Sequence, residues 1–434
     1  MNEQIHTSAL LGQTTRTVTL PSGLTVQMCQ MPGFVTAYAM LTVGFGSIDT
    51  GYRLRGKDVR LPAGAAHYLE HKMFDGPEGD AMLQFDALGA SANAFTSFDK
   101  TAYYFSCTER FEEALAVLLG FVTSPYFEGS SVRRERGIIA EELRMYRDSP
   151  DWMVTANLLQ ALYRNHPVRE DIAGTEESIA KIDAALLRRC YERFYCPDNM
   201  VLTVAGCFEE QTVLELAQRY FPAARWAARP LTVREPRKVR QTFCEQQMPI
   251  ASPMFQIGFK APGGGRENMR HRLLDELLLD LICGETTDLY RQLYQAGQIN
   301  ATFGSEVMAG RDFICCLFDG ESRQPRAVYE ALCGRIAVMR KDGIPQEDFL
   351  RCRRANYGRT IGMYGRAESV AGLMAAAHFA GMEDIYYPLE ILRSATAEEL
   401  TQRLREDFDP QYSALSVIWP EGAKHQQQGD YHER

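Results

Sequence analysis

The sequence predicts an α+β fold made of two homologous domains, each an antiparallel sheet with helices packed on it. With 434 residues, the chain is too long for one ordinary hydrophobic core. Its second half also repeats its first at a nearly constant offset. The matching positions are Ala114 and Ala331, Tyr146 and Tyr364, and Phe194 and Phe408. We therefore expect a duplicated domain.

Turn residues and hydrophobic periodicity predict the elements of the first half in order. Two strands flank a Pro-Ser-Gly turn within residues 15–33, a buried strand follows over 35–47, and a helix covers 64–74. Two further strands flank residues 97–100 within 89–107. Helices are expected over 110–122, 131–146 and 184–195, and a strand over 200–208.

These elements predict an N-terminal domain over residues 1–225 and a C-terminal domain over 243–420. Residues 226–242 are rich in Pro, Arg and Ala without clear periodicity, which is typical of a linker. The polar composition of residues 421–434 favours a disordered tail.

The composition is that of a soluble globular protein, with 45% apolar and 24% charged residues. A net charge of −9 argues against a nucleic-acid partner, because such proteins usually carry a basic surface. No signal peptide and no apolar run of membrane-spanning length is visible, so no membrane partner is expected. The 11 cysteines are odd in number and scattered, which favours buried free thiols in a reducing compartment. We expect a cytoplasmic protein.

The stretch His67-Tyr68-Leu69-Glu70-His71 predicts a metal site on a helix. Residues three and four apart share a helical face, so His67 and His71 project together with Glu70 beside them. Neutral imidazoles suit a catalytic zinc ion, which usually takes three protein ligands and a water molecule. A carboxylate beside the metal-bound water can accept its proton, which assigns the catalytic role to Glu70. The alternative is a chance pattern of two half-buried histidines on an amphipathic helix.

A third ligand is expected from the helix over 131–146, which offers Glu135, Glu141 and Glu142. Glu142 lies on a stripe with Glu135, Ile138, Ile139, Met145 and Tyr146 that we expect to point inward. Glu141 lies on the opposite, polar face. Because a buried acid is costly unless it is paired or metal-bound, Glu142 is the better ligand. Glu135, on the same face, suits a partner that orients one of the ligands.

These residues resemble the pitrilysin/insulinase family of zinc peptidases, the inverzincins, in which H-x-x-E-H is followed by a helix with the pattern E-(x)6-E. Glu135 and Glu142 match the two glutamates of that pattern. The resemblance is strongest to bacterial processing-peptidase-like members, through residues 67–98 and 145–152, and it spans nearly the whole chain. It implies a zinc-dependent endopeptidase with one Zn2+ per chain. It also implies that the two domains form a half-clamshell and that a peptide is held as an added strand in a closed chamber.

A substrate strand has a physical counterpart in residues 91–96, because an exposed sheet edge can bind an extended peptide through its backbone. The side chains of this stretch are small or polar enough to let another backbone approach, and the expected contact residues are Ser91, Ala92, Asn93, Ala94 and Thr96. The alternative is a plain surface strand.

One departure from the family concerns the oxyanion. Family members carry an arginine and a tyrosine seven residues apart that are thought to steady the substrate oxyanion. Here Tyr294 stands at the arginine position, and Asn300 or Ala301 at the tyrosine position. Tyr290 or Tyr294 can substitute only in part, because a hydroxyl group is not a guanidinium.

The sequence therefore predicts a zinc metalloendopeptidase subunit that hydrolyses peptides by means of a water activated by Glu70. We expect a heterodimer with a homologous, zinc-less subunit that supplies the Arg/Tyr pair, with a homodimer as the alternative. The competing function is a weakly active or non-catalytic peptide-binding scaffold subunit of a heteromeric complex.

Overall fold

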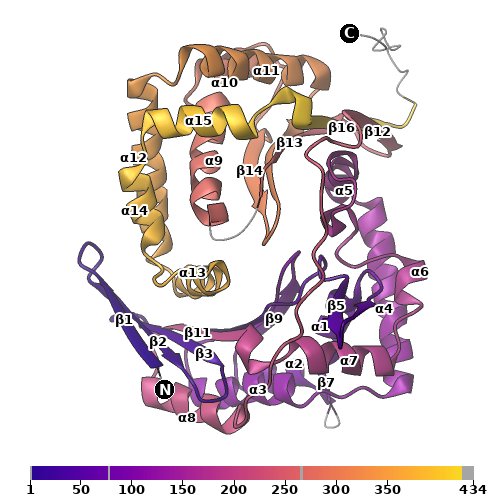
Figure 1. The fold of residues 1–434 in the computed structure, drawn as a ribbon, viewed down its shortest axis with the longest axis vertical. Helices are drawn as coiled ribbons and strands as arrows, with labels where there is room; N and C mark the ends of the chain where they lie inside the picture. Colours follow the sequence, from indigo (N-terminus) through magenta and orange to yellow (C-terminus); the bar gives the residue numbers. More distant parts are fainter. Residues whose placement is uncertain (1, 77–78, 264–266, 423–434) are drawn as a thin grey trace.

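The structure is a computed structural model that describes residues 2–76, 79–263 and 267–422. Two sheets form the framework, one in each half of the chain (Figure 1). The N-terminal sheet has seven strands in the order β1-β2-β3-β11-β4-β10-β9, and the C-terminal sheet has five in the order β12-β16-β13-β15-β14. The predicted α+β class with two related domains is confirmed.

The strands of the N-terminal half are β1 (Asn2–Ser8), β2 (Gln13–Thr19), β3 (Thr25–Gln30), β4 (Ala37–Val43), β5 (Gly51–Leu54), β6 (Lys57–Arg60), β7 (Asp75–Gly76), β8 (Gly79–Asp80), β9 (Ser91–Thr96), β10 (Thr101–Cys107) and β11 (Met200–Gly206). Those of the C-terminal half are β12 (Phe243–Met248), β13 (Met254–Ala261), β14 (Gly304–Ala309), β15 (Ile314–Glu321) and β16 (Ser413–Pro420). The strand pairs predicted within 15–33 and 89–107 are both present.

The helices of the N-terminal half are α1 (Ala65–Met73), α2 (Ala81–Ala87), α3 (Phe111–Thr123), α4 (Gly129–Asp148), α5 (Pro150–Leu162), α6 (Glu176–Ile179), α7 (Ala184–Phe194) and α8 (Glu210–Tyr220). The C-terminal half has α9 (Glu267–Cys283), α10 (Asp288–Gln295), α11 (Pro325–Asp342), α12 (Gln346–Met363), α13 (Ala367–Ala380), α14 (Tyr387–Ser394) and α15 (Ala397–Asp407). Short 3-10 turns cover Pro167–Arg169, Pro197–Asn199 and Pro410–Tyr412.

The two sheets are mixed, whereas the sequence predicted antiparallel ones. β11 runs parallel to β3, and β16 runs parallel to β12, while the other pairs within the two sheets are antiparallel. A parallel neighbour requires a long crossover connection. The helices that precede β11 and β16 supply it, and the local pattern of each strand does not reveal the direction of its neighbour.

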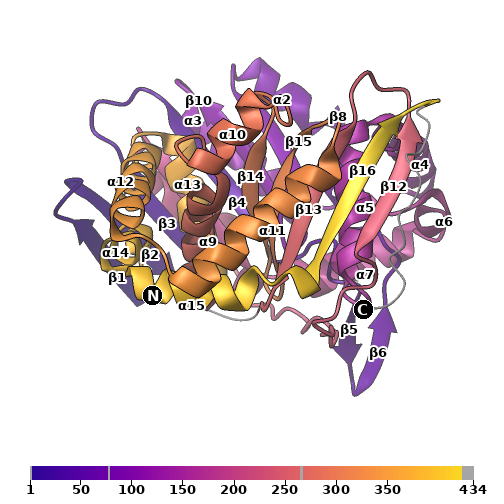
Figure 2. The ribbon, with the colours of Figure 1, turned by 90° about the horizontal axis from the view of Figure 1, so that it is seen from above.

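Each sheet is covered on its inner face by a helix from the other half of the chain. α5 packs against β13 and β16, where Leu162 shares a core with Leu317. α13 packs against β4 and β11, where Met374 shares a core with Met40. Figure 1 shows the purple α5 beside the C-terminal sheet and the gold α13 over the N-terminal sheet. The outer faces carry their own helices, such as α9, α11 and α15 on the C-terminal sheet (Figure 2).

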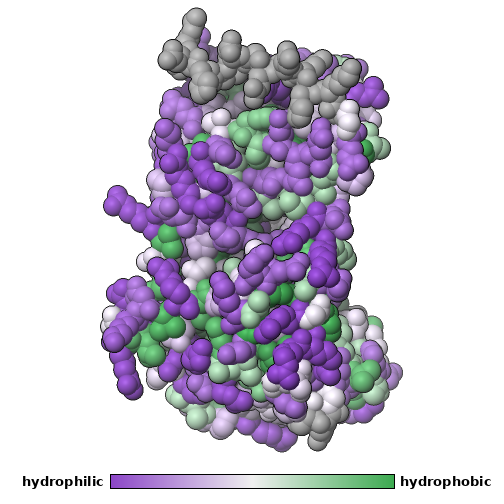
Figure 3. All heavy atoms as spheres, turned by 90° about the vertical axis from the view of Figure 1, so that its right-hand side faces the viewer, coloured by the Kyte–Doolittle hydropathy of each residue, from purple (hydrophilic) through white to green (hydrophobic). Residues whose placement is uncertain are grey.

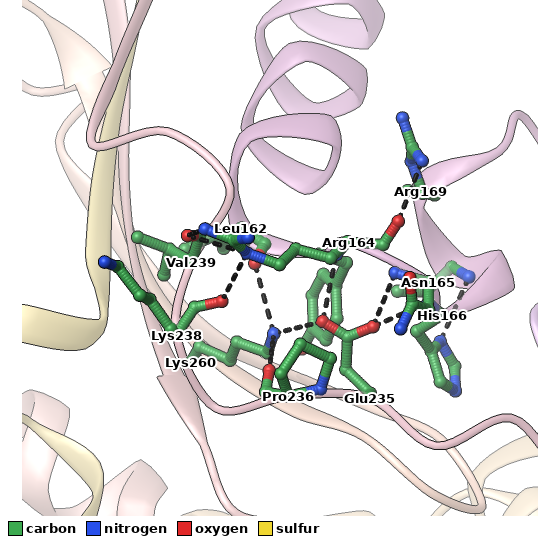
Figure 4. Close-up of polar contacts among 12 residues, drawn as sticks. Leu162, Arg164, Asn165, His166, Arg169, Glu235, Pro236, Lys238, Val239 and Lys260 are labelled. Atoms are coloured by element: carbon green, nitrogen blue, oxygen red, sulfur yellow. Dashed lines mark hydrogen bonds and ion pairs between the residues drawn. The ribbon is translucent and has the colours of Figure 1, made fainter.

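The connection between the halves is fixed by Glu235. Between α8 and β12 the chain forms no helix or ladder strand, only an isolated bridge at Pro230. Oε1 of Glu235 accepts hydrogen bonds from Arg164 N (2.9 Å) and Lys260 Nζ (2.5 Å), and Oε2 accepts from the backbone N–H groups of Asn165 and His166 (2.7 Å each) (Figure 4). One carboxylate thus ties the linker to the loop after α5 and to β13.

All 11 cysteines are free thiols and eight of them are buried, as their scatter predicted. In the described part of the chain, no helix is long and apolar enough to cross a membrane. The face seen in Figure 3 is largely polar, with its apolar patches mainly in the lower half. The predicted polar tail lies, from residue 423 onward, outside the described residues.

Candidate metal centre

α1 is held rigidly at its start and along its length. Gly64 precedes the helix at φ 83°, and a Cβ atom there would lie 2.3 Å from the carbonyl oxygen of Ala173, so only glycine fits. The Tyr68 hydroxyl donates to Val132 O (2.5 Å), and the buried Lys72 ammonium donates to Ser131 Oγ (2.5 Å). Both acceptors belong to α4, so α1 and α4 are locked side by side.

The structure brings His67, His71 and Glu142 together, with one ligand atom of each within 4.8 Å of the others. Nε2 of His67 lies 3.7 Å from Oε1 of Glu142, and Nε2 of His71 lies 3.3 Å from Oε2. Oε2 of Glu142 is buried and makes no hydrogen bond. Two imidazole nitrogens that converge with an unsatisfied carboxylate oxygen form a donor set that fits zinc. Glu141, by contrast, is 74% exposed and pairs with Arg144.

Glu135 contacts the far side of the His71 ring, with Oε1 3.0 Å from Nδ1. Burial lowers the pKa of His71, but the carboxylates of Glu135 and Glu142 outweigh burial and raise that pKa to about 10. Burial raises the pKa of Glu142, yet contacts with His67, His71 and Tyr146 outweigh it and hold that pKa well below its ordinary value. A metal ion held between these groups would therefore have to displace a proton.

Glu70 lies buried on the same helix and faces strand β9. Its Oε2 accepts a hydrogen bond of 2.6 Å from the hydroxyl of Thr96. β9 is the last strand of its sheet, with β10 on one side and no further strand on the other among the described residues. The candidate base and a free sheet edge are thus adjacent.

The residues of β9 alternate between two environments. Ala92 and Ala94 pack against the core beneath α1, and Thr96 points the same way, to Glu70. Ser91 and Asn93 are exposed on the other face of the strand. Of the five residues expected to contact a substrate, Thr96 therefore also holds the candidate base.

Two residues of the predicted inward stripe on α4 are not inward. Ile138 is 52% exposed and Met145 is 60% exposed, so this part of the prediction was wrong. They flank the half-buried Glu142 one turn away on either side. Ile139, on the same stripe, is fully buried in the core, so only part of the stripe is covered. The apolar pattern of the sequence does not show where that cover ends.

Tyr290 and Tyr294 are not brought to this centre within one chain. Both belong to α10, which lies in the upper half of the molecule, far from α1 (Figure 1). Their rings stack on each other at 5.9 Å, and Tyr294 is 50% exposed. Among the described residues, no arginine or lysine forms an ion pair with Glu70, Glu135 or Glu142.

Three further residues around Glu142 were not singled out as site residues from the sequence. Tyr146 donates a hydrogen bond to Glu142, and its ring stacks on Trp152, which in turn bonds Asp171. Tyr146 was recognised only as part of the α4 stripe. Trp152 and Asp171 lie in segments whose structure no local pattern had defined.

Fold and site together are those of the M16 peptidase family. A family model described as insulinase (peptidase family M16) matches residues 35–176, and one described as the peptidase M16 inactive domain matches residues 181–356. The chain belongs to the M16 insulinase family.

Individual relatives agree with the predicted resemblance to bacterial processing-peptidase-like proteins of the YmfH type. The uncharacterized zinc protease YmfH of Bacillus subtilis is 32% identical over 90% of this chain and 92% of its own length. A putative M16-like peptidase from Alicyclobacillus acidocaldarius has a crystal structure that superposes with a TM-score of 0.91 at 32% identity, covering 95% of this chain and 99% of that one. The mitochondrial-processing peptidase subunit beta of Saccharomyces cerevisiae is 29% identical over 53% of this chain and 49% of its own.

Proposed function

We propose that this chain is the zinc-bearing subunit of a metalloendopeptidase that cleaves extended peptides. The observation that carries the proposal is the convergence of His67, His71 and Glu142 beside Glu70, which in turn contacts the free sheet edge β9. Ligands, base and strand edge thus occupy one place, as metal-assisted peptide hydrolysis requires.

The chain's own residues have distinct tasks in this reaction. His67, His71 and Glu142 would hold a zinc ion, which would act as a Lewis acid and make a water molecule acidic enough to lose its proton near neutral pH. Glu70 accepts that proton and passes it to the leaving amine. Thr96 keeps the Glu70 carboxylate turned toward the strand edge. β9 aligns the peptide backbone beside Glu70 by strand addition.

We propose that the donor for the developing oxyanion comes from a second chain. Tyr294 occupies the position of the family's arginine, and α10 is remote from α1 in this chain. A missing oxyanion donor costs about 3 kcal/mol of transition-state stabilisation. A homologous subunit without the metal motif but with the Arg/Tyr pair would repair this loss, and a homodimer that presents Tyr290 and Tyr294 in trans is the alternative. The processing peptidase relative is itself named as a subunit.

The catalytic part of the proposal is tested by Glu70→Gln, with Glu141→Gln as the matched control. Glu70→Gln should keep about one zinc per chain but slow peptide hydrolysis about 100-fold or more, because an amide cannot accept the proton. Glu141→Gln removes an exposed carboxylate one residue from the ligand and should change neither property. Zinc content is measured by elemental analysis and cleavage by mass spectrometry of a peptide mixture. A zinc-loaded protein without turnover, alone or with its partner, would instead indicate a scaffold.

The partner is tested by assaying the chain alone and after mixing with a homologue that carries the Arg/Tyr pair. The chain alone should cleave poorly, and the mixture should form an active one-to-one complex. Arginine-to-alanine substitution in the partner should lower kcat far more than it weakens peptide binding, since that contact strengthens in the transition state. Robust turnover by the purified monomer would contradict the two-chain model.

A further inference from the structure

The third candidate ligand, Glu142, accepts a hydrogen bond from Tyr146, which lies one helical turn away. The Tyr146 hydroxyl donates a hydrogen bond of 2.5 Å to Oε1 of Glu142. Oε1 is the oxygen that faces His67, while Oε2 faces His71 and has no hydrogen bond. The phenol therefore fixes the rotation of the carboxylate, so that Oε1 faces His67 and the unbonded Oε2 faces His71.

Tyr146 is itself held in place by a tryptophan. Its ring stacks on Trp152 at a centroid distance of 4.3 Å and an interplanar angle of 9°. Trp152 lies in the first turn of α5, where its backbone N–H also bonds the Ser149 hydroxyl that caps this helix. Its indole Nε1 donates a hydrogen bond of 2.6 Å to Oδ2 of Asp171. With one face stacked and its N–H bonded, Trp152 has little freedom to rotate.

Asp171 connects this arrangement back to the start of α1. Its Oδ1 accepts a hydrogen bond of 2.9 Å from Ala173 N, which shapes the loop 171–174. That loop presses directly on the residues before α1, because a Cβ atom on Gly174 would lie 2.5 Å from Ala63 O. The Ser178 hydroxyl also donates to Ala63 O, at 2.8 Å.

Together these contacts form a continuous series that connects α1 with α4. The series begins at α1, which carries both histidines, and passes through loop 171–174 to Asp171. From Asp171 it continues to Trp152, then to Tyr146, and ends at Glu142 on α4. These contacts hold Glu142 on α4 in a fixed position relative to His67 and His71 on α1, and they do not involve the metal. The Tyr146–Trp152 stack also lies at the corner where α4 ends and α5 begins.

We propose that Tyr146, Trp152 and Asp171 are positioning residues that set the place of Glu142 relative to His67 and His71, and thus the zinc affinity and coordination geometry of the site. The inference rests on the proposed zinc function. Tyr146 acts through Glu142 and does not itself contact the peptide. Removing its hydroxyl should weaken zinc binding about 10-fold or more, the scale at which partners of metal ligands act.

The test compares Tyr146→Phe with Tyr126→Phe as a matched control. Tyr126 also donates to a glutamate, Glu128 (2.6 Å), away from the candidate centre, so both variants lose one phenol-to-carboxylate hydrogen bond. Zinc affinity is measured by competition with a chromophoric chelator, and ligand geometry by the visible absorption spectrum of the Co2+-substituted protein. Tyr146→Phe should weaken zinc and change the cobalt spectrum, whereas Tyr126→Phe should match wild type.

Trp152→Phe provides a second, graded variant. It keeps an aromatic ring for the stack but loses the N–H bond to Asp171, so its zinc affinity should fall between those of wild type and Tyr146→Phe. Melting curves of the metal-free proteins verify that each variant folds.

The possible outcomes separate the two proposals. If wild type binds no zinc, the proposed function is wrong, and the positioning role that rests on it is wrong with it. If wild type binds zinc and Tyr146→Phe has the same affinity and cobalt spectrum, the positioning role is wrong. A variant with unchanged zinc binding but a lower kcat would also overturn it, because Tyr146 would then act on the substrate directly.

Discussion

Thr96 donates a hydrogen bond of 2.6 Å from its hydroxyl group to Oε2 of Glu70. A residue of the sheet edge that is proposed to bind the peptide therefore also touches the proposed base. Hydrogen bonds to charged groups contribute about 1.5–3 kcal/mol, so this contact is strong enough to decide how the carboxylate is oriented. In the proposed reaction, this contact would link substrate alignment to proton transfer.

Thr96→Val should lower kcat about 10-fold with a small change in KM, because the carboxylate loses its orientation while the strand edge remains. Steady-state kinetics on a single peptide measures both constants. Ser91→Ala is the control on the same strand: Ser91 is exposed on the other face and does not contact Glu70, so kcat should stay unchanged even if peptide binding weakens. An effect of Thr96→Val on KM alone would mean that Thr96 serves the substrate and not Glu70.

Glu135→Ala should weaken zinc binding about 10- to 100-fold, because the His71 ring loses the partner that holds it 3.0 Å away at Nδ1. Glu135→Gln should lose less, since its amide oxygen can still accept from Nδ1–H. Chelator competition gives both affinities. Equal affinities for the alanine variant and wild type would show that His71 needs no orientation by Glu135.

Glu235→Ala should destabilise the protein by about 3–5 kcal/mol, because it leaves the buried Lys260 ammonium and three backbone N–H groups without their carboxylate acceptor. Urea unfolding monitored by fluorescence measures the loss. Adding Lys260→Met should recover part of it, since the unpaired charge is removed. If the double variant is as unstable as Glu235→Ala, the ion pair is not the main cause.

The buried carboxylates Asp275 and Asp407 should make stability depend on pH. Both are fully buried beside Arg403, and burial raises the pKa of Asp407 to about 6 and that of Asp275 well above its ordinary value. A carboxyl group whose folded-state pKa is raised stabilises the fold below its unfolded pKa, and this stabilisation is lost as the pH rises through the folded value. The free energy of unfolding of the metal-free protein should therefore fall between pH 4 and pH 7.

Asp275→Asn should reduce that fall by about 1–3 kcal/mol, because one of the two competing charges is gone. Unfolding in urea at pH 5 and pH 7.5 measures the difference. Asp58→Asn, at an exposed pair with Arg53, is the control and should leave the slope unchanged. If the free energy of unfolding of Asp275→Asn falls between pH 5 and pH 7.5 as much as that of wild type, the pH dependence arises from other groups.

The parts of the site that a single helix encodes were predictable from the sequence. Helical spacing puts His67 and His71 on one face and separates Glu142 from Glu141, and in the structure Glu142 faces the histidines while Glu141 faces solvent. The same periodicity misplaced Ile138 and Met145, because it identifies an apolar stripe without telling whether that stripe is covered.

The parts that depend on distant segments were not predictable. No local pattern indicates that the indole of Trp152 meets Asp171, or that Thr96 meets Glu70, because these pairs form only after the sheet and helices have packed. α5 was missed as an element, and its position on the sheet of the other half follows from tertiary packing alone. The parallel strand pairs were missed for the same reason.

α5 and α13 each pack on the sheet of the other half of the chain, and this arrangement affects how a substrate can enter. A movement of one half away from the other would separate α5 and α13 from the sheets they cover and would expose two apolar cores to water. The linker anchored by Glu235 adds a further restraint at the joint. Separating the two halves is therefore costly, and we expect the described part of the chain to move as one unit. In the proposed two-chain enzyme, we therefore expect the opening through which a peptide reaches Glu70 to lie between the two chains.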